Sequence, residues 1–97
     1  MSKLKIISEE KDTEEMVKTA ILAEIKRLEV ALRRTEREIR KFEEEYRVPS
    51  EVFLRDFAAE NLKGGDEDYV KWAGELQMRE RIREDLRKLK DIEYVSH

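Results

Sequence analysis

Few residues of this chain have the types and spacings that carry out chemistry. The single histidine, His97, has no partner that the sequence identifies. The acidic triplets at 43–45 and 66–68 lack the ligand spacing of a calcium loop, and Gly64-Gly65 is typical of a turn. The absence of cysteine excludes disulfides, thiolate metal sites and thiol nucleophiles. We therefore predict no catalytic residue, no metal site and no cofactor, and a protein that is not an enzyme.

A second kind of site to consider is a basic surface for nucleic acid. Arg33, Arg37 and Arg40 lie on the outer face of a predicted helix. Glutamates interleave with these cations and would repel phosphate. Pairs four residues apart, such as Glu29 with Arg33, are also typical of a solvated helical face. The net charge of -3 gives no overall field towards nucleic acid or an anionic membrane, so nucleic-acid binding is a less favoured alternative.

The composition is that of one small domain with long solvated helical faces. Charged residues make up 46% of the 97 residues, against roughly 25% in an average domain. No apolar run approaches the roughly 20 residues needed to span a bilayer, and the N-terminal segment lacks the features of a signal peptide. We expect a single cytoplasmic domain, 1–97, without a membrane partner. Heavy use of Glu, Lys and Arg with few Asn and Gln is typical of thermophiles.

The element that organises the chain is a long helix predicted over 13–46. No glycine or proline interrupts this stretch. Its length of about 50 Å follows from a rise of about 1.5 Å per residue. Such a helix cannot bury its own apolar stripe, so other elements must cover it. The stripe has the alternating four- and three-residue steps of a coiled-coil seam. It consists of Ile21, Ile25, Leu28, Leu32, Thr35, Ile39, Phe42 and Tyr46.

A short second helix is predicted over 51–62. Pro49 ends the long helix, because it disfavours helical geometry in the residue before it. Ser50 is a good N-cap for the second helix. The glycine pair after Lys63 ends it, since glycine readily takes a positive φ.

A third helix is predicted over 67–92, running back along the first. Arg79 falls where the apolar seam should continue, and we expect its guanidinium to reach the acidic edge of the first helix. Residues 1–12 are expected to form an arm, because an isolated strand would have nothing to pair with in a helical chain. Residues 93–97 are expected to form a frayed tail.

The aromatic residues indicate where the helices meet. Six of the seven lie between positions 42 and 72, around the two connections. We expect them to meet at one end of the molecule, beneath the short helix. The predicted fold class is all-α, a long antiparallel and coiled-coil-like hairpin with a short lid helix. The predicted structural core is Phe42, Tyr46, Phe53, Phe57, Tyr69 and Trp72.

A difference in helix length predicts an association surface. The first and third helices are about 51 and 39 Å long, so about 12 Å of the first helix overhangs at its start. The apolar stripe is widest there, and a bare apolar patch of this kind is an association surface. We predict a homodimer, a complex with a small protein partner, or both. The predicted interface is Met16, Val17, Ala20, Ile21, Leu22, Ile25 and Leu28.

The block from Tyr46 to Ala73 contains a set of spaced residues that resembles a recurrent pattern of other small proteins. After the tyrosine come S-x-x-F-x-x-x-F from Ser50 and G-D-x-D-Y-x-x-W-A from Gly65. This block resembles a set of small, uncharacterised archaeal and bacterial helical proteins from two-gene operons of the toxin–antitoxin type, where they are the antitoxin-like component. Arg47 stands where that pattern has a glycine. The resemblance covers about a third of the chain plus the helix before it.

The sequence therefore predicts a non-enzymatic protein–protein interaction module. The resemblance implies its most concrete form, the antitoxin-like partner of a small toxin. The alternative is a structural homo-oligomeric coiled-coil protein, with a nucleic-acid-binding helical protein less favoured.

Overall fold

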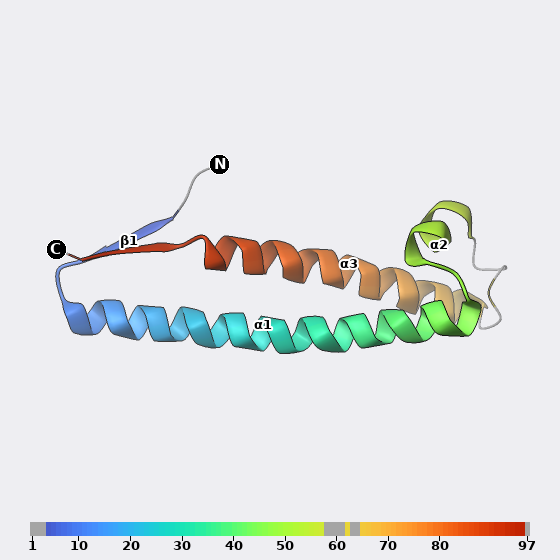
Figure 1. Ribbon diagram of the computed structural model, residues 1–97, viewed down its shortest axis with the longest axis horizontal. Coiled ribbons are helices and arrows are strands. Elements are labelled where there is room, and N and C mark those ends of the chain that lie inside the picture. The colour runs from blue at the N-terminus through green and yellow to red at the C-terminus, as the bar shows by residue number, and fades with distance from the viewer. Residues whose placement is uncertain (1–3, 58–61, 63–64, 97) are drawn as a thin grey trace.

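Two long antiparallel helices form the body of the molecule in the computed structural model, which describes residues 4–57, 62 and 65–96 (Figure 1). A short helix packs at one end, and the described part measures 59 × 25 × 18 Å. The predicted all-α hairpin with a lid helix is confirmed. Both long helices begin two residues earlier than predicted. The elements in order are β1 (Lys5–Ser8), α1 (Lys11–Tyr46), α2 (Ser50–Asp56), α3 (Gly65–Lys90) and β2 (Glu93–Ser96).

The lid helix α2 is shorter than the predicted range 51–62. It ends where Phe57 takes an extended backbone, with φ -102° and ψ 141°. The Phe57 N–H donates the last hydrogen bond of the helix, to the Phe53 carbonyl. Leaving helical geometry lets the Phe57 ring pack against the core cluster beneath α2. Residues 58–61 of the predicted helix lie outside the described residues.

The end of α1 is set by Arg47, which takes the left-handed conformation with φ 55° and ψ 43°. The N–H groups of Arg47 and Val48 both donate to the Glu43 carbonyl, which completes the hydrogen bonding of the last helical turn. Arginine therefore takes the backbone role of the glycine in the recurrent pattern. The left-handed residue turns the chain so that α2 lies over the N-terminal part of α3 (Figure 1).

The expectation of an N-terminal arm and a frayed tail was wrong. Lys5–Ser8 and Glu93–Ser96 form a two-stranded parallel sheet, in a register that pairs Lys5 with Glu93 and Ser8 with Ser96. The Glu93 N–H donates to the Leu4 carbonyl at 2.9 Å. The N-terminal strand therefore does have a partner, which is the segment that follows the third helix.

The parallel direction of the sheet follows from the hairpin. The chain reverses between β1 and α1, and again between α1 and α3, so β1 runs in the same direction as α3 and β2 (Figure 1). The two strands lie at the start of α1, where the longer helix overhangs. Lys18 of α1 holds its ammonium 5.6 Å from the centre of the Tyr94 ring, a cation–π contact that ties β2 to the helix.

The core consists of two apolar clusters along the hairpin. The cluster at the lid end centres on Ile39, Phe53, Leu62, Trp72 and Leu76. The second cluster is nearer the sheet and contains Leu28, Ile82 and Leu86.

Between the clusters, the apolar seams of both helices are interrupted. The seam position between the two clusters is occupied by Thr35 on α1 and by Arg79 on α3. The apolar core of the hairpin is therefore not continuous.

Parallel aromatic rings form the centre of the lid-end cluster. Trp72 is fully buried and stacks on Phe53 with a centroid distance of 4.0 Å and an interplanar angle of 3°. Phe42 and Tyr46 of α1 stack on the same indole at 5.6 and 5.8 Å. Phe57 and Tyr69 pack against this cluster and are partly buried. The structure thus brings together all six predicted core residues, and Phe53 and Trp72 are its most buried rings.

We expect Phe53→Ala to lower the free energy of unfolding by about 3–5 kcal/mol, because it empties a fully buried ring position. Urea denaturation followed by circular dichroism measures this change. The matched control is Leu54→Ala on the same helix, since Leu54 is exposed and its truncation should cost less than about 0.5 kcal/mol. Equal losses for the two variants would contradict the docking of α2 through Phe53.

Candidate interaction surfaces

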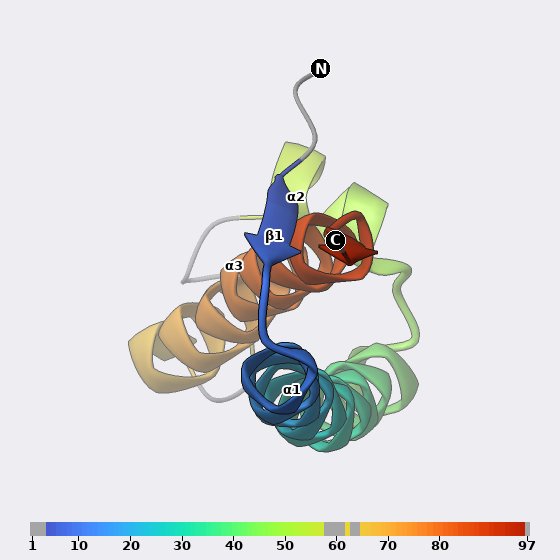
Figure 2. The ribbon, with the colours of Figure 1, turned by 90° about the vertical axis from the view of Figure 1, so that its left-hand side faces the viewer.

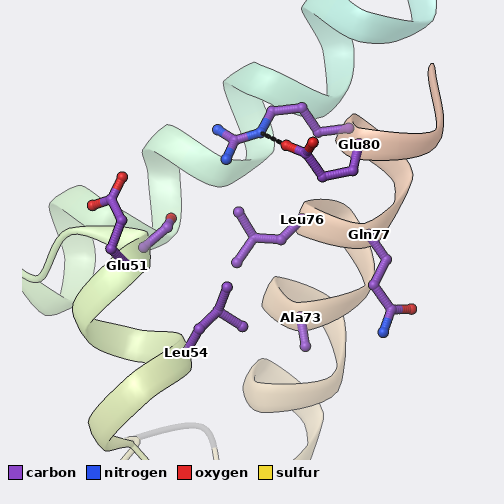
Figure 3. A pocket seen from close by; sticks show the side chains of 8 residues that line it. Glu51, Leu54, Ala73, Leu76, Gln77 and Glu80 are labelled. Carbon is purple, nitrogen blue, oxygen red and sulfur yellow. Dashed lines mark ion pairs between the residues drawn. The ribbon is translucent and has the colours of Figure 1, made fainter. Parts of the chain in front are cut away.

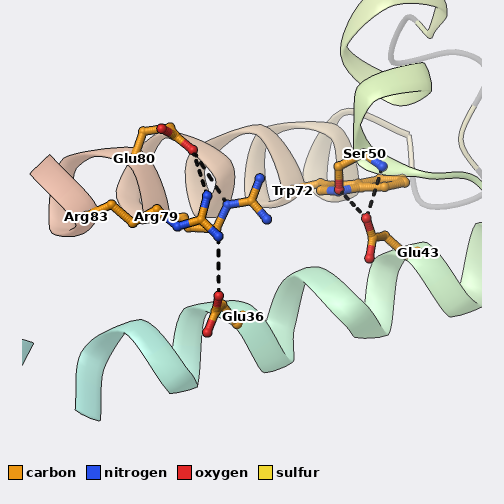
Figure 4. Close-up of polar contacts among 7 residues, drawn as sticks. All are labelled: Glu36, Glu43, Ser50, Trp72, Arg79, Glu80 and Arg83. Atoms are coloured by element: carbon orange, nitrogen blue, oxygen red, sulfur yellow. Dashed lines mark hydrogen bonds and ion pairs between the residues drawn. The ribbon is translucent and has the colours of Figure 1, made fainter. Parts of the chain in front are cut away.

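Three helices are joined by a buried hydrogen-bonded chain through Ser50 (Figure 4). The Trp72 Nε1–H donates to Ser50 Oγ at 3.0 Å. The Ser50 hydroxyl and backbone N–H both donate to Glu43 Oε2, at 2.8 and 3.0 Å. Ser50 is 3% exposed, so its hydroxyl cannot act as a nucleophile on a substrate. The group serves to position the helices.

This chain of hydrogen bonds corrects the N-cap prediction for Ser50. The N-cap of α2 is Pro49, which makes no side-chain capping hydrogen bond, and the first N–H of the helix donates to Glu43 of α1 instead. The serine hydroxyl instead satisfies the indole N–H, which is costly to bury without an acceptor. A second contact joins the same two long helices, because the Tyr46 hydroxyl donates to Asp68 Oδ2. The residues that carry the family resemblance are therefore residues that hold the helices together.

The interruption between the two apolar clusters contains unsatisfied polar atoms. Thr35 is 0% exposed, and its Oγ1 has no hydrogen-bond partner among the described residues. The Arg79 side chain is 24% exposed, and its buried Nε likewise has no hydrogen-bond partner there. This layer weakens the hairpin, since an unsatisfied buried polar group costs about 1–3 kcal/mol.

The expectation that Arg79 would reach the first helix was wrong. Its Nε lies 3.8 Å from Glu80 Oε1 in the same helix (Figure 4). The cross-helix ion pair is made by Arg83, whose Nη2 lies 3.5 Å from Glu36 Oε2. Arg83 lies one turn further along α3 than Arg79, and its side chain is more exposed, at 48% against 24%. It lies outside the packed seam and can therefore extend across to Glu36.

An open groove lies between α2 and α3 (Figure 3). Leu54 of α2 and Leu76 of α3 face each other across it, and Leu54 is 58% exposed. The volume of the groove is about 510 Å³. The sequence signal for it was Leu54 itself, an apolar residue next to Phe53. Adjacent residues point about 100° apart around a helix, so burial of Phe53 leaves Leu54 turned away from the core. The lining residues are Ser50, Glu51, Leu54, Ala73, Leu76, Gln77, Arg79 and Glu80.

The predicted interface on α1 is divided by the packing of the hairpin. Leu28 is buried in the second apolar cluster, and Ile25 packs against it. Val17 and Ile21 are half-buried, because they face the same side as Leu28. This part of the predicted surface is used within the chain.

The remaining predicted interface residues are exposed. Met16, Ala20 and Leu22 all lie outside the seam. Successive residues turn by about 100° around a helix, so Met16 and Ala20 lie on one flank of the seam and Leu22 on the other. The exposed residues therefore do not form one continuous patch. Leu4 and Ile7, at the β1 end of the same region, are exposed as well.

Local ion pairs occur along the surface of the hairpin. Arg27 donates two hydrogen bonds of 2.7 Å to Glu24, which lower the pKa of that carboxyl and raise the pKa of the guanidinium. Arg87 lowers the pKa of Glu84 in the same way. Exposed pairs three residues apart contribute little to stability. The cations of the predicted basic face, Arg33, Arg37 and Arg40, are exposed.

No cluster of metal-ligating side chains appears in the described part of the chain. Among residues 4–57, 62 and 65–96, no group of three or more acidic or histidine side chains is placed to hold a metal ion. His97 lies outside the described residues. Among the same residues, no helix has the length and apolar character needed to cross a bilayer.

Comparison with known family models, curated proteins and solved structures finds no match to this chain. The resemblance of the block 46–73 to antitoxin-like proteins thus stays a prediction. The groove between α2 and α3 and the exposed apolar residues of β1 and α1 are the features on which a function can be argued.

We expect Ser50→Ala to lower the free energy of unfolding by about 1–3 kcal/mol, because it leaves the buried Trp72 N–H without an acceptor. Trp72→Phe removes that donor, so a double-mutant cycle isolates the hydrogen bond. The two substitutions should couple by about 0.5–3 kcal/mol, measured by urea denaturation with circular dichroism. Strictly additive effects would show that this hydrogen bond does not stabilise the fold.

We expect Thr35→Val to raise the free energy of unfolding by about 1 kcal/mol, because it removes a buried hydroxyl without a hydrogen bond and keeps the shape of the side chain. Thr19→Val is the matched control, since Thr19 is exposed on the same helix and should change little. Thermal and urea denaturation measure both variants. A loss of stability on Thr35→Val, with Thr19→Val neutral, would mean that the hydroxyl is satisfied in solution.

Proposed function

We propose that this protein is a non-enzymatic protein–protein interaction module that binds its partner in the groove between α2 and α3. The observation that supports this is the exposure of Leu54 in an open groove with Leu76 on its opposite wall. A groove bounded by two helices and lined by aliphatic side chains fits the apolar face of an amphipathic helix. The partner would add the apolar cover that α2 and α3 lack.

The charges of the groove define the partner further. Arg79 lines the groove, and its buried Nε–H has no acceptor among the described residues. Its ion pair with Glu80 spans 3.8 Å, which is too long for a hydrogen bond. A partner helix with a leucine-like side chain between Leu54 and Leu76 would fill the apolar part of the groove. A carboxylate one turn away on that helix would pair with the exposed part of the Arg79 side chain, which is 24% exposed.

The most concrete form of this function is an antitoxin-like protein whose partner is a small toxin. The block 46–73 that carries the family resemblance contains α2 and the start of α3. Ser50 and Ala73 belong both to that block and to the lining of the groove. On this proposal, these two recurrent residues contribute to the surface that the toxin occupies, and the recurrent aromatic residues form the core that supports it.

A structural homo-oligomer is the second candidate. It is supported by the exposed apolar residues at the opposite end of the molecule, Leu4 and Ile7 before α1 and Met16 and Leu22 on it. The two proposals use different surfaces and are compatible. They differ in what they require, because the antitoxin-like function needs the product of a neighbouring gene.

We expect Leu54→Glu to weaken binding of the adjacent reading frame's product by at least about tenfold, because it places a charge in the apolar groove. Two measurements test this, protection of cells from the toxic effect of that product and retention of the complex during purification. The fold should be unchanged, since Leu54 is exposed, and circular dichroism checks this.

Val70→Glu is the matched control. Val70 is an exposed aliphatic residue of α3 outside the groove, so this variant should protect and bind like the unmodified protein. Unchanged binding on Leu54→Glu would overturn the assignment of the groove. A neighbouring product that is harmless alone and does not bind would overturn the antitoxin-like function.

A further inference from the structure

The small sheet leaves each of its strands with one unpaired edge. It contains only β1 and β2 in the described part of the chain. In the end-on view, β1 stands in front of the helices, nearest the viewer (Figure 2). A two-stranded sheet is at best marginally stable alone, and three or more strands are normally needed. An open edge is also a template for pairing with another strand.

The hydrogen bond between the strands determines which backbone groups face the open edge of β1. The Glu93 N–H donates to the Leu4 carbonyl, and Lys5 is the register partner of Glu93. In a parallel ladder, backbone groups of alternate residues face the same neighbour. The N–H and C=O of Ile6 therefore face β2. Those of Lys5 and Ile7 point to the open edge.

The side chains of the same alternate residues form a self-complementary pattern. Lys5, Ile7 and Glu9 are all exposed, with Ile7 at 61%, whereas Ile6 and Ser8 between them are half-buried. Lys5 and Ile7 of β1, and Glu9 in the bend directly after the strand, are thus basic, apolar and acidic at two-residue spacing. When a second copy runs in the opposite direction, the basic residue of each copy faces the acidic residue of the other, and the two apolar residues face each other.

We propose that β1 pairs antiparallel with β1 of a second copy of this chain and makes a twofold-symmetric dimer with a four-stranded sheet. Ile7 lies opposite Ile7 of the second copy on the symmetry axis. Lys5 lies opposite Glu9 of the second copy, and this pair occurs twice. This pairing uses the backbone N–H and C=O groups that point to the open edge. Those groups occur at every second residue, so the only other registers that keep the hydrogen bonds are shifted by two residues or a multiple of two.

Those shifted registers are unfavourable. One centres the pair on Lys5 and sets two lysines opposite each other, and another sets Ile7 opposite a charged residue. The register centred on Ile7 alone satisfies both charge and apolar contact. This dimer is independent of the proposed partner groove, because α2 lies at the other end of the molecule (Figure 1).

Charge reversal tests the register directly. Lys5→Glu and Glu9→Lys should each raise the dimer dissociation constant by about tenfold or more, because each places like charges opposite each other at both pairs. An equimolar mixture of the two variants should form a heterodimer with roughly the original affinity, since every facing pair is then of opposite sign. Sedimentation velocity with one variant fluorescently labelled measures all three cases.

Ile7→Pro tests the edge pairing without relying on charge. It removes the N–H that points to the open edge, and that N–H is not used in the ladder with β2, so the monomer should keep its fold by circular dichroism. We expect the dimer to be lost. A monomeric unmodified protein at tens of micromolar, single variants that dimerise normally, or a mixture that stays monomeric would each overturn the proposal.

Discussion

The burial of the Trp72 indole is the constraint on which the rest of the fold depends. The ring is fully buried, so its N–H must find an acceptor within the protein. That acceptor is Ser50, the first residue of α2, and Ser50 is held by Glu43 from the last turn of α1. One tryptophan of α3 therefore positions both other helices. The left-handed Arg47 makes this possible, because it reverses the chain within the few residues between Glu43 and Ser50.

The packing between the two long helices changes with distance from this anchored end. The aromatic stack gives way to a layer with Thr35 and Arg79, whose buried polar atoms lack hydrogen bonds within the described residues. The second apolar cluster follows, and then α3 ends while α1 continues. The overhang of α1 would leave apolar surface bare. The chain covers part of it with the segments before α1 and after α3, which meet as a parallel pair.

The two ends of the molecule therefore offer different surfaces. At the lid end, a rigid aromatic core supports a groove between helices, and the exposed Leu54 is held on a helix that Phe53 anchors. At the other end, a two-stranded sheet presents a hydrogen-bonding edge and an outward pattern of opposite charges. A hairpin 59 Å long keeps these surfaces apart, so the proposed dimer edge and the proposed partner groove do not overlap.

The sequence alone determined the helices and their antiparallel arrangement. The reason is that the seam of α1, the break at Pro49 and the grouping of six aromatics around the connections are local signals that tertiary packing reinforces. It could not predict the role of Ser50, because a serine before a helix is equally suited to a cap, and only the position of Trp72 decides between the two. It also could not choose between Arg79 and Arg83 for the bond to Glu36, since that choice depends on which side chain the packed seam leaves free.

The sheet could not be predicted from the sequence, for a different reason. Each strand has only four residues, too few for a periodic signal, and the two lie at opposite ends of the chain. Their pairing depends on the difference in length between α1 and α3, and that difference acts only once the hairpin has formed. The groove likewise exists only after α2 has docked on α3, because docking buries Phe53 and leaves its neighbour Leu54 exposed. Local patterns therefore determined the elements of this protein, and the packing of the hairpin decided which of their surfaces are left for binding.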